Sequence, residues 1–190
     1  VPLGKNVYEE VKNICALQKE SGKFADYIDG TGEDFVNAHI WGIISLYMAN
    51  YEEYNKSKAL KWLRENQNSD GGFPVYVGYN NSDLDMTAMA LVAYGILGMD
   101  SDSAEVKKAI SFIENNIGRN ESAESYSWYI IARIQLKLSV DKALYENLMK
   151  YKLQDGSFKH LESLKKSNYM ATWHGLLALS DYNNKASTID

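Results

Sequence analysis

Apolar residues recur with the period of an α-helix in eight stretches of the chain. These stretches predict helices near residues 7–20, 34–49, 56–67, 83–98, 102–117, 122–137, 140–152 and 167–182. Residues that favour helix N-caps stand near six of the expected starts: Asp34, Ser57, Asp83, Ser103, Asp141 and Asn168. The sequence lacks sustained strand alternation, and its nearest approach, Phe73–Gly78, lies inside a linker. The pattern therefore predicts an all-α protein of about four helical hairpins.

The predicted helices alternate in charge. The first, third, fifth and seventh carry charged side chains, whereas the second and fourth contain none from Phe35 to Met48 and from Met86 to Met99. A helix without charge is covered on most sides, and an amphipathic helix keeps one face in water. We therefore expect an outer charged layer around an inner apolar layer, curved into an arc or a ring.

The chain also repeats. A Gln followed by Gly and then by an aromatic residue occurs in Gln18–Phe24, Gln67–Phe73 and Gln154–Phe158. The inner segments align on four equivalent positions, which are 48, 39 and 46 residues apart: Gly42, Ala90, Tyr129 and Gly175. An irregular period of about 44 residues is typical of helical hairpins rather than of propeller blades.

Charge and composition exclude several classes of protein. A net charge of −5 argues against nucleic-acid binding, which needs a basic face. The single cysteine, Cys15, excludes an internal disulfide and a thiolate metal cluster. No apolar run is long enough to span a membrane. Because the chain starts at Val1 without an initiator Met, we expect residues 1–190 to be one domain of a longer protein.

The stretch Lys58–Phe73 resembles the QW repeat of squalene cyclases and their relatives, with Phe73 in place of the usual Trp. This family folds as an α/α toroid, so the resemblance implies a partial toroid. In such a repeat the Gln binds unpaired backbone groups at a neighbouring helix end, and the aromatic ring covers the turn. We expect the three Gln–Gly–aromatic motifs to have this structural role.

One enzymatic interpretation of the resemblance depends on two acidic residues. Class II terpene cyclases protonate an alkene with an Asp-x-Asp-Asp-Thr motif, and the matching residues are Asp83, Asp85 and Thr87. Asp85 matches the proton donor, but Met86 replaces the last Asp of the motif. The alternative is that Asp83 caps a helix and that Asp85 is an acid of its first turn. An isoprenoid enzyme that uses Asp85 as general acid is thus the alternative function.

The zinc site of protein prenyltransferases is not expected. That family holds zinc with Asp, Cys and His, and the matching positions carry Ala123, Ser125 and, approximately, Ala171. None of these three side chains is a zinc ligand. The resemblance therefore predicts no metal and favours a protein that is not an enzyme.

The runs Asp155–His160 and Asn168–Thr172 resemble repeats of bacterial secreted or cell-surface proteins, which are related to cobalamin carriers such as intrinsic factor and transcobalamin. This resemblance implies a non-catalytic ligand-binding or interaction module outside the bacterial cell. The implied ligand is a small organic molecule, with a corrinoid as one example, and the implied protein partner is another domain of the same chain.

A ligand is expected where the inner helices of a toroid begin, because their N-termini gather backbone N–H groups at one rim. The alternative is that the polar groups there only cap and cross-link the helices. The candidate ligand-binding residues are Asn37, His39, Trp41, Asp83, Asp85, Thr87, Glu124, Tyr126, Trp128, Tyr169, Thr172 and His174.

Overall fold

The computed structural model describes residues 7–119 and 121–186, and this part of the chain forms eight helices. The helices are α1 (Tyr8–Ala16), α2 (Val36–Met48), α3 (Lys56–Glu65), α4 (Leu84–Ile96), α5 (Ala104–Asn116), α6 (Ala123–Gln135), α7 (Lys142–Met149) and α8 (Tyr169–Ala186). One small antiparallel sheet joins β1 (Phe73–Pro74) to β2 (Ser82–Asp83) within the linker before α4. The all-α prediction is confirmed.

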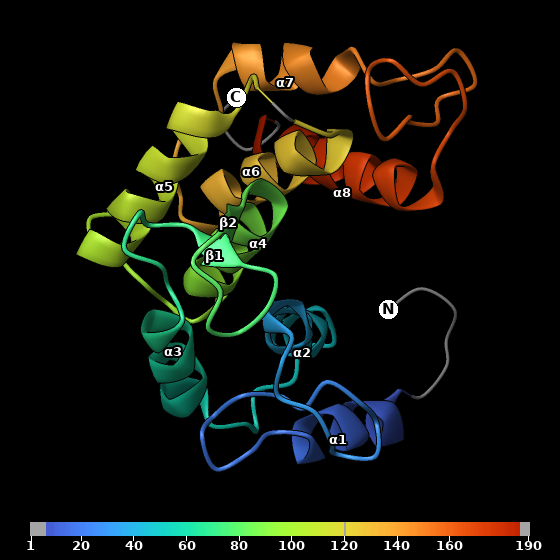
Figure 1. Cartoon of the computed structure of the whole chain (residues 1–190). Coiled ribbons are helices and arrows are strands. Elements are labelled where there is room, and N and C mark those ends of the chain that lie inside the picture. Colours follow the sequence, from blue (N-terminus) through green and yellow to red (C-terminus); the bar gives the residue numbers. More distant parts are fainter. Residues whose placement is uncertain (1–6, 120, 187–190) are drawn as a thin grey trace.

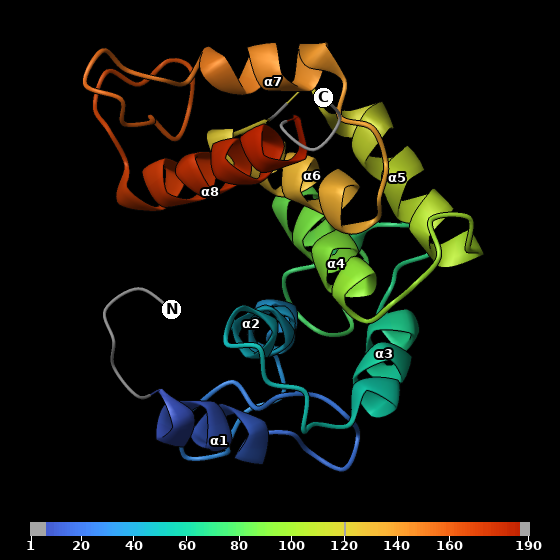
Figure 2. The ribbon, with the colours of Figure 1, turned by 180° about the vertical axis from the view of Figure 1, so that it is seen from behind.

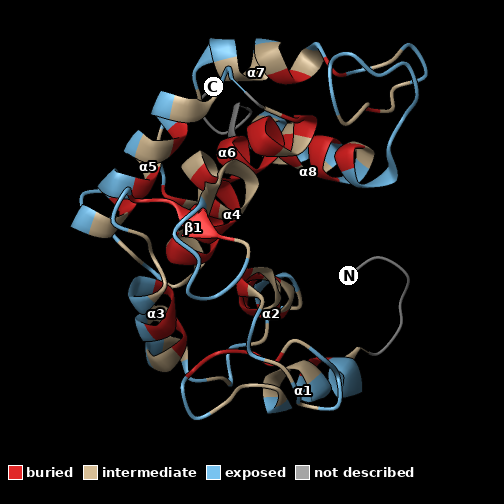
Figure 3. Ribbon diagram, in the orientation of Figure 1, coloured by how far each residue is buried: buried red, intermediate tan, exposed pale blue. Residues whose placement is uncertain are grey.

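The helices form two layers that curve into an open arc (Figure 1). The inner layer contains α2, α4, α6 and α8, and neighbours in this order pack against one another, as the reverse view also shows (Figure 2). The outer layer contains α1, α3, α5 and α7. Among the helices, buried residues concentrate in the inner layer and exposed residues in the outer layer (Figure 3). The predicted partial α/α toroid is confirmed.

The burial of individual helices follows their sequences. In α5 only Val106, Ala109 and Ile113 are buried, one stripe at helical spacing. In α4 every residue of Thr87–Tyr94 is buried, because α2, α5 and α6 all pack around it. The absence of charge from most of α2 and α4 thus predicted their place in the inner layer correctly.

The Gln of the repeat joins successive outer helices. Gln67 Nε2 donates to the carbonyl of Gly71 at 2.8 Å and to that of Glu105 in α5 at 2.9 Å. Gln18 Nε2 binds its own turn and the carbonyl of Asn55, the N-cap of α3, at 3.0 Å. For these two motifs the predicted structural role is confirmed.

The aromatic residue of the repeat is tied to the inner layer. The backbone N–H of Phe73 donates to Thr87 Oγ1 at 2.9 Å, and that of Phe158 donates to Thr172 Oγ1 at 2.9 Å. Both rings are buried. Each turn is thereby bonded to the inner helix that follows it.

Two predicted N-caps are wrong. The N-cap position of α2 is Phe35 rather than Asp34, and no side-chain hydrogen bond caps the helix. Instead the carboxylate of Asp26, in the preceding loop, accepts the backbone N–H groups of both residues. Helix α3 is capped by Asn55 rather than Ser57, since the Asn55 side chain accepts a first-turn N–H. Other predicted helix ends differ from the observed ones by a few residues, because capping contacts rather than the apolar pattern fix where a helix starts and ends.

Candidate functional site

The candidate residues separate into groups that face different directions. His39, Thr87 and Thr172 face the turns between the layers rather than the inside of the arc. His39 Nδ1 accepts the backbone N–H of Phe24 at 3.1 Å, so its Nε2 donates to the carbonyl of Ala59 at 3.1 Å. Burial lowers the pKa of His39 to about 3, and the ring is therefore neutral at pH 7.

Tyr126, Asn37 and Tyr169 also lie apart from the other candidate residues. Tyr126 is buried against the ring of Tyr151, and its hydroxyl reaches Glu121 at 3.4 Å. Asn37 is half-buried in the first turn of α2. Tyr169 begins α8 and is 82% exposed, so it lies outside any enclosed site.

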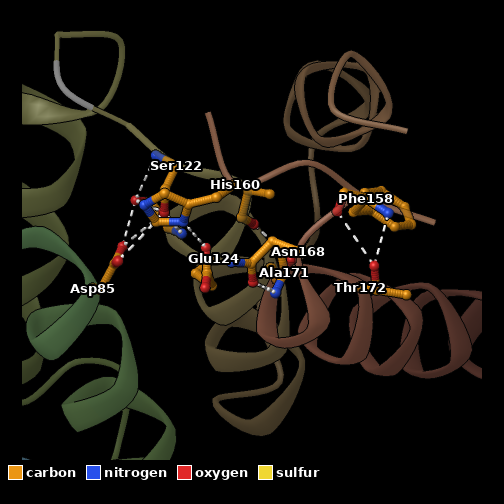
Figure 4. A network of polar contacts seen from close by, with 11 residues as sticks. Asp85, Ser122, Glu124, Phe158, His160, Asn168, Ala171 and Thr172 are labelled. Carbon is orange, nitrogen blue, oxygen red and sulfur yellow. Dashed lines mark hydrogen bonds and ion pairs between the residues drawn. The ribbon is translucent and has the colours of Figure 1, made fainter. Parts of the chain in front are cut away.

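A polar network links the N-termini of α4, α6 and α8 (Figure 4). At one end of the network lies Asp85, whose carboxylate accepts the hydroxyls of Ser125 and of Ser122, the latter at 3.3 Å. Ser122 and Ser125 also form the reciprocal capping box of α6. Asp85 therefore ties the start of α4 to the start of α6.

Burial raises the pKa of the Asp85 carboxyl, and the nearby charges of Asp83 and Glu124 act in the same direction. The hydrogen bonds from Ser125 and Ser122 oppose this effect. Asp83 is the N-cap of α4, accepting the N–H of Met86 at 2.8 Å, so its predicted capping role is confirmed.

The Asp155–His160 run supplies the next contact of the network. His160 Nδ1 pairs with the carboxylate of Glu124, and the His160 carbonyl accepts the N–H of Ala123 at 2.9 Å. Asn168 Oδ1 then accepts the N–H of Ala171 at the start of α8, at 3.0 Å. These contacts cap the inner helices, bond α4 to α6, and bond α6 to the turn that contains His160.

The positions that match prenyltransferase zinc ligands do not fit a metal. Ala123 and Ala171 are buried alkyl side chains, and the Ser125 hydroxyl is engaged by Asp85. Among the residues that the structure describes, no three His, Cys, Asp or Glu side chains are grouped to hold a metal ion. No chemical step is therefore assigned to zinc. In the same residues, no helix is both long and apolar enough to cross a membrane.

The remaining candidates meet inside the arc. The ring of Trp41 from α2 stacks on Trp173 of α8 at a centroid distance of 5.6 Å and meets Trp128 of α6 edge-on at 5.5 Å. The ring centroids of His174 and Trp128 lie 4.6 Å apart. His174 is 4% exposed, and neither of its ring nitrogens has a hydrogen-bond partner among the described residues. Burial lowers the pKa of His174.

A hollow lies beside this aromatic cluster, toward the C-terminal ends of the inner helices. Its volume is about 170 Å³. All four inner helices line it, through Ile44, Tyr47, Met48, Val92, Ile96, Trp128, Ile131, Gln135, Leu177 and Asp181. Sequence reasoning placed the site at the N-terminal rim and missed this hollow. The available signal was that α2 and α4 contain no charged residue in their second halves, from Gly42 to Met48 and from Leu91 to Ile96.

The arrangement of the helices has a solved counterpart. The structure of "Candida albicans protein geranylgeranyltransferase-I complexed with GGPP" matches 90% of this chain with a TM-score of 0.61 at 16% sequence identity. The chain spans 57% of that protein's length. At this identity the likeness establishes the toroid fold alone. No curated protein matches the chain significantly.

The sequence itself identifies the family. The family described as "Squalene-hopene cyclase N-terminal domain" matches residues 41–137, which is just over half of the chain. The matched segment contains α3 to α6 and most of α2. The chain belongs to this family and is a toroid domain of the prenyltransferase and terpene-cyclase type.

Proposed function

We propose that the inside of the arc binds an isoprenoid or similar apolar chain, as part of a terpene-cyclase-like or prenyltransferase-like protein. The observation that carries this proposal is the hollow lined by alkyl side chains from all four inner helices, next to the cluster of three tryptophans. Sites for apolar ligands are lined mainly by apolar side chains with a small number of polar groups, which here belong to Tyr47, Gln135 and Asp181. The similar geranylgeranyltransferase-I is complexed with GGPP, which is consistent with this ligand class.

The hollow favours one end of a chain over a bulky ligand. Its volume of about 170 Å³ is below the roughly 300–1,000 Å³ of pockets that enclose a drug-sized molecule. A chain could insert one end and lie along the tryptophans. The corrinoid expected from the cobalamin-carrier resemblance is a macrocycle and fits this space less well. The extracellular location and the partner domain remain predictions.

A fluorescence titration with geranylgeraniol tests the proposal, because Trp128 lines the hollow. We expect saturable quenching that is lost in Met48→Asp, which adds a charge at a wall residue that is already 53% exposed. The matched control is Ile28→Asp, at a 97% exposed loop position, and it should bind normally. Equal binding by both variants would place the ligand elsewhere, and no binding by the unmodified protein would refute the proposal.

A second candidate is catalysis by Asp85, favoured by the burial that raises the pKa of its carboxyl. Asp85 does not line the hollow, and it precedes Val92, the first wall residue of α4, by seven residues, or about 10 Å at the helical rise. A substrate would therefore have to extend about two helical turns beyond the hollow to reach Asp85. Turnover of a polyprenyl substrate that Asp85→Asn abolishes, while binding persists, would establish this role. Turnover that survives the substitution would exclude it.

A further inference from the structure

Three inner helices end beside the hollow. Their last residues, Met48 of α2, Ile96 of α4 and Gln135 of α6, all line it. The turn after each helix bonds several of its last carbonyls, among them those of Leu46, Tyr94 and Arg133. The aligned peptide dipoles of each helix still leave a partial negative charge at this end. The three helix ends therefore add their negative potentials in one small space.

Asp181 adds a carboxylate to the same space. This residue of α8 lines the hollow and is half-buried. Within the described part of the chain its side chain has no hydrogen bond or ion pair. Burial raises the pKa of this carboxyl, as expected for an acid without a cation beside it.

Basic side chains of α2, α4 and α6 do not neutralise this charge. The last turns of α2 and α4 contain none. Arg133, in the last turn of α6, is held elsewhere, because it donates to the Tyr129 hydroxyl at 3.0 Å and to the Ser139 carbonyl at 2.6 Å. It also pairs with Glu114 at 3.6 Å. None of the residues that line the hollow is basic.

The negative potential favours a positively charged ligand, and the side chains of the walls decide which kind. Trp128 and Tyr47 offer aromatic rings, which attract cations, and the other wall residues are mainly alkyl side chains. A small hydrated inorganic cation would gain little from such walls. A positive group attached to an apolar body would match both the negative end and the alkyl surface.

We infer that the hollow binds an amphiphilic organic cation, an ammonium group carried on an apolar chain, with the ammonium next to Asp181. The preference for a chain rests on the function proposed above, whereas the preference for a positive end rests on Asp181 and the three helix C-termini. The two parts can fail separately, and the experiment is designed to distinguish them.

Isothermal titration calorimetry at pH 7 with decylammonium, decanol and decanoate, below micelle-forming concentrations, tests the inference. The three probes share one chain and differ only in the charge of the end group. We expect decylammonium to bind about tenfold more tightly than decanol, and decanoate to bind most weakly. In Asp181→Asn the advantage of decylammonium should fall to about threefold or less, while decanol binding stays unchanged.

Asp102→Asn is the matched control, since Asp102 is an exposed acid outside the hollow that pairs with Lys107. It removes the same charge and should leave the order of the three probes intact. Equal binding of decylammonium and decanol would overturn the inference while leaving the apolar-chain proposal standing. An ammonium advantage that persists in Asp181→Asn would also overturn it. Binding of decylammonium without any binding of decanol or geranylgeraniol would support the cation site and refute the isoprenoid proposal.

Discussion

Trp41 stacks on Trp173 across the inside of the arc, at 5.6 Å between ring centroids and 14° between ring planes. This contact joins α2 to α8, the first and last inner helices, which are far apart in the sequence. With Trp128 and His174 the pair fills the arc toward the N-terminal ends of the inner helices and leaves the hollow toward the other ends. The aromatic cluster is therefore both a structural contact and one wall of the proposed site.

The Trp41–Trp173 contact should contribute measurably to stability. Aromatic pairs of this geometry are worth about 0.5–1.5 kcal/mol beyond the area they bury. A double-mutant cycle with Trp41→Ala and Trp173→Ala, followed by urea unfolding, should give a coupling free energy in that range. Leu176→Ala, on the same helix and 52% exposed, should not couple with Trp41→Ala. A coupling of zero between the two tryptophans would show that this contact between α2 and α8 does not stabilise the protein in solution.

The hydrogen bond from the Phe73 N–H to the Thr87 hydroxyl should stabilise the packing of the turn against inner helix α4. Thr87→Val keeps the shape of the side chain but leaves the buried N–H of Phe73 without an acceptor, at a cost of about 1–3 kcal/mol of unfolding free energy. Thr87→Ser should restore most of the loss, because the hydroxyl returns. Thr31→Val, at an exposed loop position, provides the comparison. Urea unfolding would contradict this role if Thr87→Val were as stable as the unmodified protein.

Substitutions at Gly71 and Gly78 distinguish the cost of backbone strain from the cost of a steric clash. Both have positive φ, +90° and +80°. A Cβ at Gly71 would lie 2.4 Å from the Lys108 carbonyl oxygen, whereas a Cβ at Gly78 would meet nothing within 4 Å. Gly78→Ala should therefore cost about 1–2 kcal/mol from backbone strain alone. Gly71→Ala should cost about 1–3 kcal/mol more, because outer helix α5 must move away. Similar midpoints of thermal unfolding for the two variants would be the contrary result.

Stability should fall below about pH 6.5 because of His39. Its folded pKa of about 3 is below the ordinary value of 6.5, so the unfolded chain binds the extra proton first. The contribution is fully present above pH 6.5 and is lost as the pH falls toward 3, at up to about 1.4 kcal/mol per pH unit for one proton. His174 shifts in the same direction. Urea unfolding between pH 4 and 7 should show a shallower pH dependence in His39→Gln, and an identical dependence would mean that His39 is not buried as described.

The layers and the repeat motifs could be predicted from the sequence, because each depends on local patterns. The uncharged helices had to be inner ones, and the spacing from Gln67 to Phe73 matched a known turn. The site could not be predicted in the same way. Trp41 and Trp128 were identified, but their partner Trp173 was not, since no local rule places α2 against α8. His39 and Thr87 resembled site residues because a polar group on an apolar helix is conspicuous, yet both bind the backbone of a preceding turn.

The most direct test of the account is a methyl NMR titration of the isoleucine-labelled protein with geranylgeraniol. We predict that the methyl signals of Ile44, Ile96 and Ile131, which line the hollow, shift with one common saturation curve. The signals of Ile28 in an exposed loop and of Ile113 in the buried face of α5 should stay in place. Shifts confined to Ile28 or Ile113, or no saturable shift at any isoleucine, would contradict the claim that the inside of the arc binds an apolar chain.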